Sequence, residues 1–272
     1  MLILNSSKKI NKIIKRSIVY KHAISIGKIG NVESAELINY LQGEKKPLSN
    51  ELFINAGIYI ENTKDYLDWC EAYLESIKNL DYILDWNSLD KPLINQFFKK
   101  KQIFKSFIGL EPFQLNKKGW HYFLDNKTTL CVSPFSKSVQ QQSKIFHKIW
   151  PGANLGKVET VDSPHSEALT GTAPIPWKKK FKNITDNIDQ LNFDFATIGC
   201  GGLSLLVCNH IKKMGIPNVH LGGGNQVLYG IKGKRWDQNF KNHAWYGNEY
   251  WKRPELDETP MRKDLVENGC YW

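Results

Sequence analysis

A glycine-rich turn between an apolar strand and a helix is the feature that most constrains how this chain can fold. Residues 193–198 have the character of a buried strand, residues 199–202 (GCGG) form the turn, and residues 203–214 have helical periodicity. Gly215 then ends the helix, and residues 218–221 begin the next strand. These segments predict a β-α-β unit, whose two strands must lie parallel in one sheet. The sequence therefore predicts an α/β, Rossmann-like fold with a mostly parallel sheet flanked by helices.

The turn inside this unit can bind an anion. Glycines let backbone N–H groups approach a phosphate, and the positive end of the following helix adds to the attraction. A tight packing turn without a ligand is the alternative. The second strand ends in Val219-His220-Leu221, without the acidic residue that holds a ribose in nicotinamide sites, so we disfavour redox and methyl-transfer cofactors. The candidate binding residues of this turn are Gly199, Gly201 and Gly202.

A second glycine cluster and a basic run follow the second strand. The segment 222–237 reads GGGNQVLYGIKGKRWD, which places three cations within four residues. Such cations can neutralise a diphosphate, arginine through two parallel hydrogen bonds, and the tryptophan can stack on a base or a sugar. A solvated basic hairpin is the alternative. The candidate binding residues here are Gly222, Gly223, Gln226, Lys232, Lys234, Arg235 and Trp236.

Two further segments offer candidates for ligand binding and catalysis. Lys28 and Gly30, as candidate binding residues, and Glu33 lie where an early strand is expected to meet a helix. Glu33 either complements the dipole of that helix or serves as a metal ligand or catalytic carboxylate. The polar stretch 162–176 is expected to be a long loop, and long loops in compact domains are often functional. His165 lies in that loop and is the best catalytic candidate among the histidines.

The length of 272 residues suits a single α/β domain, 1–272, in three parts. Residues 1–20 form a basic helix or tail, residues 21–243 form the Rossmann-like core, and residues 244–272 form an irregular aromatic segment that wraps the core or acts as a lid. The first part has isoleucines near helical spacing between lysines. Such a helix either contacts a membrane surface or packs on its own core.

The composition indicates a cytoplasmic protein with an anionic partner. A formal charge of +10 favours nucleotides, nucleic acids, anionic glycans or phospholipid headgroups, although a merely basic surface gives the same charge. The five cysteines are odd in number and no two are spaced C-x-x-C, which argues against a disulfide framework or a zinc-cysteine site. No apolar run reaches the roughly 20 residues of a membrane-spanning helix, and a secretory signal is not expected. Peripheral attachment to a membrane surface stays open.

Three pieces of the chain carry a resemblance to one family: residues 25–33 (SIGKIGNVE), residues 132–135 (VSPF) with 140–142 (QQQ), and residues 195–236, which include GIKGKRW. On these residues the chain is similar to glycosyltransferases of the GT-D fold, founded on a bacterial domain once of unknown function. The resemblance implies a Rossmann-like fold, a UDP-sugar donor and a divalent metal, Mn²⁺ or Mg²⁺. Asn31 stands where the family has an aspartate, so only Glu33 of the acidic pair carries over.

We therefore predict a glycosyltransferase of polysaccharide biosynthesis, which moves a sugar from a nucleotide-diphosphate sugar to a glycan, a lipid-linked acceptor or another hydroxyl. In this interpretation the basic run stabilises the leaving diphosphate, Glu33 contacts the metal or the sugar, and Trp236 stacks on donor or acceptor. Two alternatives stay open. A nucleic-acid-binding or base-glycosylating protein is favoured by the charge, and an inactive Rossmann-like scaffold is favoured by Asn31.

Overall fold

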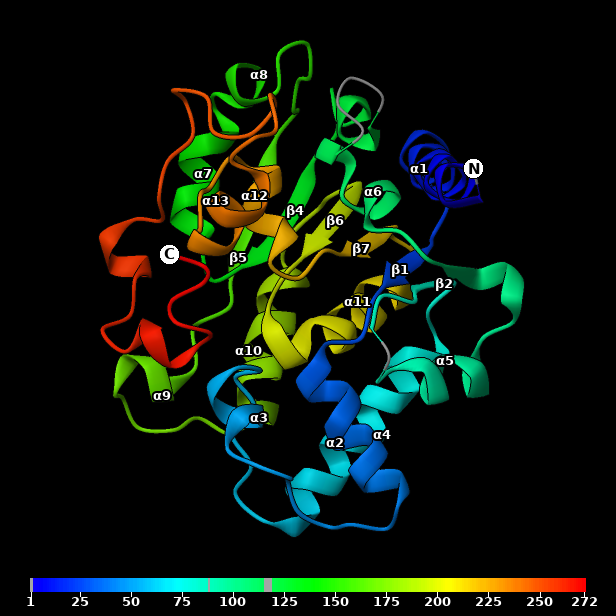
Figure 1. Cartoon of the computed structure of the whole chain (residues 1–272), viewed down its shortest axis with the longest axis vertical. Helices are drawn as coiled ribbons and strands as arrows, with labels where there is room; N and C mark the ends of the chain where they lie inside the picture. Colours follow the sequence, from blue (N-terminus) through cyan, green and yellow to red (C-terminus); the bar gives the residue numbers. More distant parts are fainter. Residues whose placement is uncertain (1, 88, 115–118) are drawn as a thin grey trace.

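The centre of the molecule is a parallel sheet, as the β-α-β unit requires. The computed structural model describes residues 2–87, 89–114 and 119–272. Over these residues seven strands, all parallel, form one sheet in the order β3-β2-β1-β7-β6-β4-β5 (Figure 1). This arrangement confirms the predicted α/β, Rossmann-like fold. The strands are β1 (Ser25–Gly27), β2 (Tyr82–Leu84), β3 (Ile103–Phe104), β4 (Thr129–Ser133), β5 (Val158–Asp162), β6 (Phe195–Ile198) and β7 (Asn218–His220).

Helices cover both faces of the sheet, because alternate strand residues point to opposite sides. One face carries α2, α4, α10 and α11, and the other carries α1, α6, α7 and α12 (Figure 1). The helices are α1 (Leu2–Tyr20), α2 (Asn31–Leu41), α3 (Glu51–Ile54), α4 (Thr63–Lys78), α5 (Lys91–Phe97), α6 (Phe107–Leu110), α7 (Ser136–Ser143), α8 (Phe146–Ile149), α9 (Glu167–Thr170), α10 (Trp177–Ile188), α11 (Ser204–Lys213), α12 (Gly224–Leu228) and α13 (Lys234–Phe240). Short 3-10 turns are η1 (Lys100–Gln102), η3 (Trp120–Phe123), η4 (Gly201–Leu203), η5 (Leu256–Glu258) and η6 (Lys263–Leu265).

The basic N-terminal segment is a helix that packs on its own core. Ile10, Ile14 and Ile18 on α1 are fully buried, whereas Lys8 and Lys12 are exposed. This one-sided pattern is that of an amphipathic helix on a globular core. Among the described helices, none combines the length and the apolar character needed to cross a lipid bilayer.

The aromatic segment 244–272 packs against the same side of the sheet as α12. Its Trp245 ring lies 5.4 Å from the ring of Phe113 and 4.9 Å from that of Phe240, centroid to centroid. Trp251 and Trp272 are almost fully buried. The segment therefore wraps the core through ring contacts, as one of the two predicted arrangements requires.

The order of the strands creates a crevice at one edge of the sheet. From β4 the chain runs through α7 to β5, while from β6 it runs through α11 to β7 in the opposite direction and on the opposite face. Where neighbouring strands lead away in opposite directions, the loops at their carboxyl ends separate and leave room for a ligand.

Candidate functional site at the carboxyl edge of the sheet

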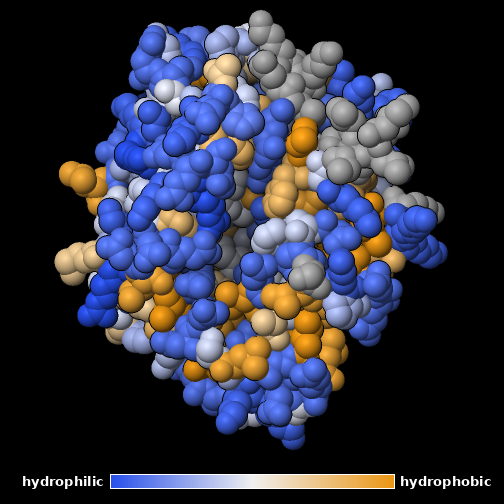
Figure 2. Space-filling view, in the orientation of Figure 1, coloured by the Kyte–Doolittle hydropathy of each residue, from blue (hydrophilic) through white to orange (hydrophobic). Residues whose placement is uncertain are grey.

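A cavity of about 270 Å³ lies at this carboxyl edge. In the space-filling view the same face of the molecule is hollowed near its centre (Figure 2). The segment 244–272 supplies the outer wall through Val266, Glu267, Tyr271 and Trp272. The rest of the lining comes mainly from segments that follow strands: 28–33 after β1, Trp86 after β2, 133–135 after β4, 163–166 after β5, 199–201 after β6, and 222–226 after β7.

The two glycine turns meet at the floor of this cavity. A Cβ atom on Gly199 would collide with the carbonyl oxygen of Gly222, so only glycine allows this approach. Gly201 and Gly222 have φ angles of 58° and 57°, which also favour glycine. A Cβ on Gly201 would lie 2.5 Å from the carbonyl oxygen of Ala56. The predicted turns are thus held against each other by close backbone contacts.

Their backbone N–H groups differ in availability. The N–H of Gly202 donates to the carbonyl of Ala56 at 2.8 Å, and that of Cys200 donates to the hydroxyl of Ser204 at 3.0 Å. Gly202 also does not line the cavity, so its predicted role in anion binding is not supported by its position. In the described part of the chain, the N–H groups of Gly201 and Gly223 have no acceptor. These two amides can therefore receive an anion.

Two cations from different segments line the cavity beside the turns. The ammonium of Lys28 lies 3.8 Å from the Glu111 carboxylate and 4.6 Å from the ring centre of Phe107. Burial lowers the pKa of Lys28, Glu111 opposes the shift, and the charge of Arg235 adds to it. The guanidinium of Arg235 is ion-paired with Glu267. Lys28 and Arg235 thus bring two basic side chains to the cavity, each beside one carboxylate.

The basic run around Arg235 is divided by the geometry of α13. Lys232 precedes the helix, and the consecutive side chains of Lys234 and Arg235 point in different directions, so that of these three Arg235 lines the cavity. Lys232 and Lys234 do not line it, and Lys234 donates instead to the carbonyl of Asn268 at 3.1 Å. The Trp236 ring is 5% exposed and packs on Gly223, beneath the cavity surface. The predicted diphosphate and stacking roles of these three residues therefore do not match where they lie.

Gly30 and Glu33 line the cavity, and Asn31 lies beside them. The Glu33 carboxyl folds back over Gly30, where any Cβ would collide with it. Burial raises the pKa of Glu33, which favours the protonated form. Over the described ranges, no three His, Cys, Asp or Glu side chains converge as a metal site. This donor set does not fit a divalent metal held by the protein alone.

His165 also lines the cavity, in the loop after β5. Its Nε2 lies 2.9 Å from the carbonyl oxygen of Glu258, and its ring packs between Phe135 at 5.6 Å and Trp272 at 5.3 Å. Burial lowers its pKa, which favours the neutral ring. Since a carbonyl can only accept, Nε2 carries the hydrogen and Nδ1 keeps a lone pair.

Sequence reasoning missed two groups in the lining. His220 at the end of β7 donates from Nδ1 to the carbonyl of Lys28 at 3.0 Å, and burial with the nearby Lys28 lowers its pKa to about 3. Its place at a strand's carboxyl end was the available signal. Lys180 on α10 is buried and pairs with Glu167 at 2.7 Å. It shares the spacing of the buried Trp177 and Ile184, which would have placed it on the inner face of the helix.

Comparison with known proteins gives no relative on which to base a function: no family model matches the chain, and neither a curated protein nor a solved structure matches it. The function is therefore argued from the geometry of the cavity.

Proposed function

We propose that the protein is a glycosyltransferase that takes its sugar from a nucleotide-diphosphate donor, with UDP as the expected nucleotide. One observation carries the proposal. Two glycine turns in backbone contact, with Lys28 and Arg235 beside them, face a single cavity at the carboxyl edge of a parallel sheet. This combination provides free amides and cations for a pyrophosphate.

The chemistry follows from which groups face the cavity. The acceptor hydroxyl attacks the anomeric carbon of the donor sugar, and the bond between that carbon and the diphosphate oxygen breaks. The developing charge on the diphosphate is stabilised by Arg235, Lys28 and the amides of Gly201 and Gly223. The hydroxyl proton passes to Nδ1 of His165, the nitrogen that is left without a hydrogen. His165 is thus the proposed base, and the basic end of the cavity the proposed donor site.

A thermal-shift screen of UDP, GDP, CMP and their sugars, with and without Mn²⁺, tests this proposal. A ligand that binds only the folded protein raises its melting temperature. We expect one nucleotide class to stabilise the protein, its sugar conjugate to be hydrolysed or transferred, and the Mn²⁺ arm to report any metal dependence. No stabilisation by any of these compounds would contradict the proposal.

Nucleic acid is the alternative partner, and one observation favours it. Lys8, Lys9 and Lys12 are exposed on α1, a helix with no acidic residue. A DNA or RNA affinity that falls steeply with salt would support nucleic-acid binding or glycosylation of bases. Nucleotide binding without retention of DNA would leave the sugar-transfer proposal in place.

A further inference from the structure

Glu258 joins the outer wall of the cavity to helix α7. It lies in η5 with 6% of its surface exposed. One carboxylate oxygen accepts the N–H of Lys137 at 2.7 Å, and the other accepts the N–H of Ser138 at 3.2 Å together with the Ser138 hydroxyl. Phe135, at the N-cap of α7, has no side chain that could accept these bonds. A residue about 120 positions away therefore caps the helix.

The backbone carbonyl of the same residue binds two rings of the cavity wall. It accepts Nε2–H of His165 at 2.9 Å and the indole N–H of Trp272 at 2.9 Å. Both rings line the cavity. The carboxylate thus sets the position of a carbonyl that in turn sets the position of His165.

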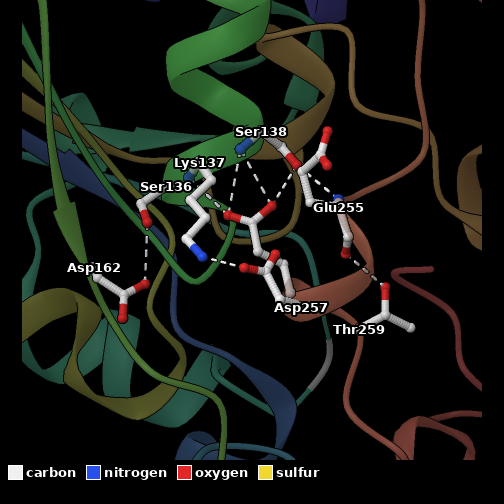
Figure 3. A network of polar contacts seen from close by, with 8 residues as sticks. Ser136, Lys137, Ser138, Asp162, Glu255, Asp257 and Thr259 are labelled. Carbon is white, nitrogen blue, oxygen red and sulfur yellow. Dashed lines mark hydrogen bonds and ion pairs between the residues drawn. The ribbon is translucent and has the colours of Figure 1, made fainter.

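Neighbouring bonds fix the turn on both sides of Glu258. The Ser138 hydroxyl accepts the N–H of Glu255 at 3.0 Å, and the Thr259 hydroxyl donates to the carbonyl of Glu255 at 3.1 Å (Figure 3). On the solvent side, Asp257 pairs with Lys137 (Figure 3). The bonds from Glu258 to Ser138 are buried, whereas the neighbouring ion pair of Asp257 with Lys137 is exposed to solvent, so Asp257 provides a matched control.

We propose that Glu258 is a positioning residue. Its carboxylate binds the start of α7 and so fixes the place of its backbone carbonyl, which accepts the Nε2–H of His165. His165 therefore keeps its hydrogen on Nε2 and presents Nδ1 to the acceptor hydroxyl. The role in transfer rests on the proposed function, whereas the control of the His165 tautomer does not. Other ionisable groups on the elements around this ring include Asp162, Lys137, Asp257, Glu167, Lys180 and Glu267.

Nitrogen NMR of protein labelled with ¹⁵N-histidine tests the tautomer without any substrate. We expect wild-type His165 to be an Nε2–H tautomer that titrates below the ordinary value of about 6.5. In Glu258→Gln the backbone N–H and the hydroxyl of Ser138 lose their carboxylate acceptor. The tautomers should then mix. Because the bond to the Glu258 carbonyl raises the pKa of His165 against the effect of burial, weakening that bond should move the titration further below the ordinary value. Ser138→Ala should change both in the same direction by less, and Asp257→Asn should change neither.

Several results would overturn the proposal. One is an Nδ1–H tautomer in the wild type, and another is an unchanged His165 in both Glu258→Gln and Ser138→Ala. Ser138→Ala keeps the test decisive if Glu258→Gln fails to fold. In a sugar-transfer assay, Glu258→Gln should lower kcat at least about tenfold while the KM for the donor stays within about twofold.

The failure of this inference can be told from the failure of the proposed function. If the wild type transfers no sugar but the tautomer responds to Glu258→Gln, transfer is wrong and the positioning of His165 stands. If the wild type transfers sugar and Glu258→Gln transfers it equally well, the positioning role is wrong and the transferase stands.

Discussion

The floor and the outer wall of the cavity are built in different ways. The floor consists of the turn after β6, residues 199–201, and the end of β7 with the turn after it, residues 220–226, which follow directly from a β-α-β unit. The outer wall, residues 255–272, is irregular and is held by contacts such as that between Glu258 and Ser138, 120 positions apart. Local sequence rules specify the floor, while long-range contacts specify the wall. The two free amides of the proposed anion site lie in the first region, its cations Lys28 and Arg235 come from other segments, and the proposed positioning of the base depends on the outer wall.

The largest expected effect concerns the buried ion pair beside the floor. Lys180→Met leaves the Glu167 carboxylate buried without its partner, and should lower the free energy of unfolding by about 3 kcal/mol. Lys182→Met, on the same helix but at an exposed pair with Asp186, should change it by less than about 0.5 kcal/mol. Urea unfolding of the two variants measures the difference. Equal effects would show that Lys180 is not a structural part of the site.

A smaller effect is expected where the two turns of the floor touch. Gly199→Ala places a Cβ against the carbonyl of Gly222 and should cost about 2 kcal/mol of stability in urea unfolding. Gly215 has a φ of 82° and open space around it. Gly215→Ala should therefore lower the free energy of unfolding by only about 1 kcal/mol, through backbone strain alone. If Gly199→Ala left the free energy of unfolding unchanged, the two turns could not be packed as closely as described.

Ligand binding provides the next contrast, between neighbouring cations inside and outside the cavity. Arg235→Ala should lower donor affinity or turnover at least tenfold, on the order of 1.4 kcal/mol. Lys234→Ala should leave both unchanged, since Lys234 faces Asn268 rather than the cavity. Steady-state kinetics, or titration with the nucleotide found by the screen, measures this pair. A loss of the same size in Lys234→Ala would mean that charge alone, and not position, matters.

The smallest expected effect is a pH dependence that originates in the floor. The folded protein keeps His220 neutral, with its pKa lowered to about 3, whereas the unfolded chain binds a proton near 6.5. Below that pH the unfolded state takes up more protons, so stability falls as the pH falls. When the pH falls from about 7.5 to about 5.5, the free energy of unfolding measured in urea should fall by about 1 kcal/mol less in His220→Gln than in the wild type. An identical loss in both would show that His220 is not held neutral.

Much of the floor could be predicted from sequence because its signals are local. An apolar strand, a glycine turn and a helix that ends at a glycine define β6, η4 and α11, and the early SIGKIGNVE segment defines β1 and the start of α2. β2 and β3 have three and two residues, and neither is followed by a glycine turn like those that mark the ends of the equally short β1 and β7. Local patterns therefore could not predict the complete order of the strands in the sheet.

The rest of the site could not be predicted, for physical reasons that differ between residues. A basic run looks uniform in sequence, so it predicts the same role for Lys232, Lys234 and Arg235. In the structure Lys232 precedes α13, and the helix that starts at Lys234 points the side chains of Lys234 and Arg235 in different directions. Trp236 packs on Gly223 because both belong to one compact turn-and-helix segment. Glu258 carries no local signal at all, since its partners on α7 and at the chain end meet it only in the folded molecule.

Calorimetric titration of inorganic pyrophosphate into the wild type and Lys28→Met/Arg235→Ala tests the central claim most directly, because it requires neither the right base nor the right sugar. We expect saturable binding at one site in the wild type, at least about tenfold weaker in the double variant, and unchanged in Lys234→Ala. Absence of binding to the wild type, or equal binding by the double variant, would contradict the account of the cavity as a pyrophosphate site.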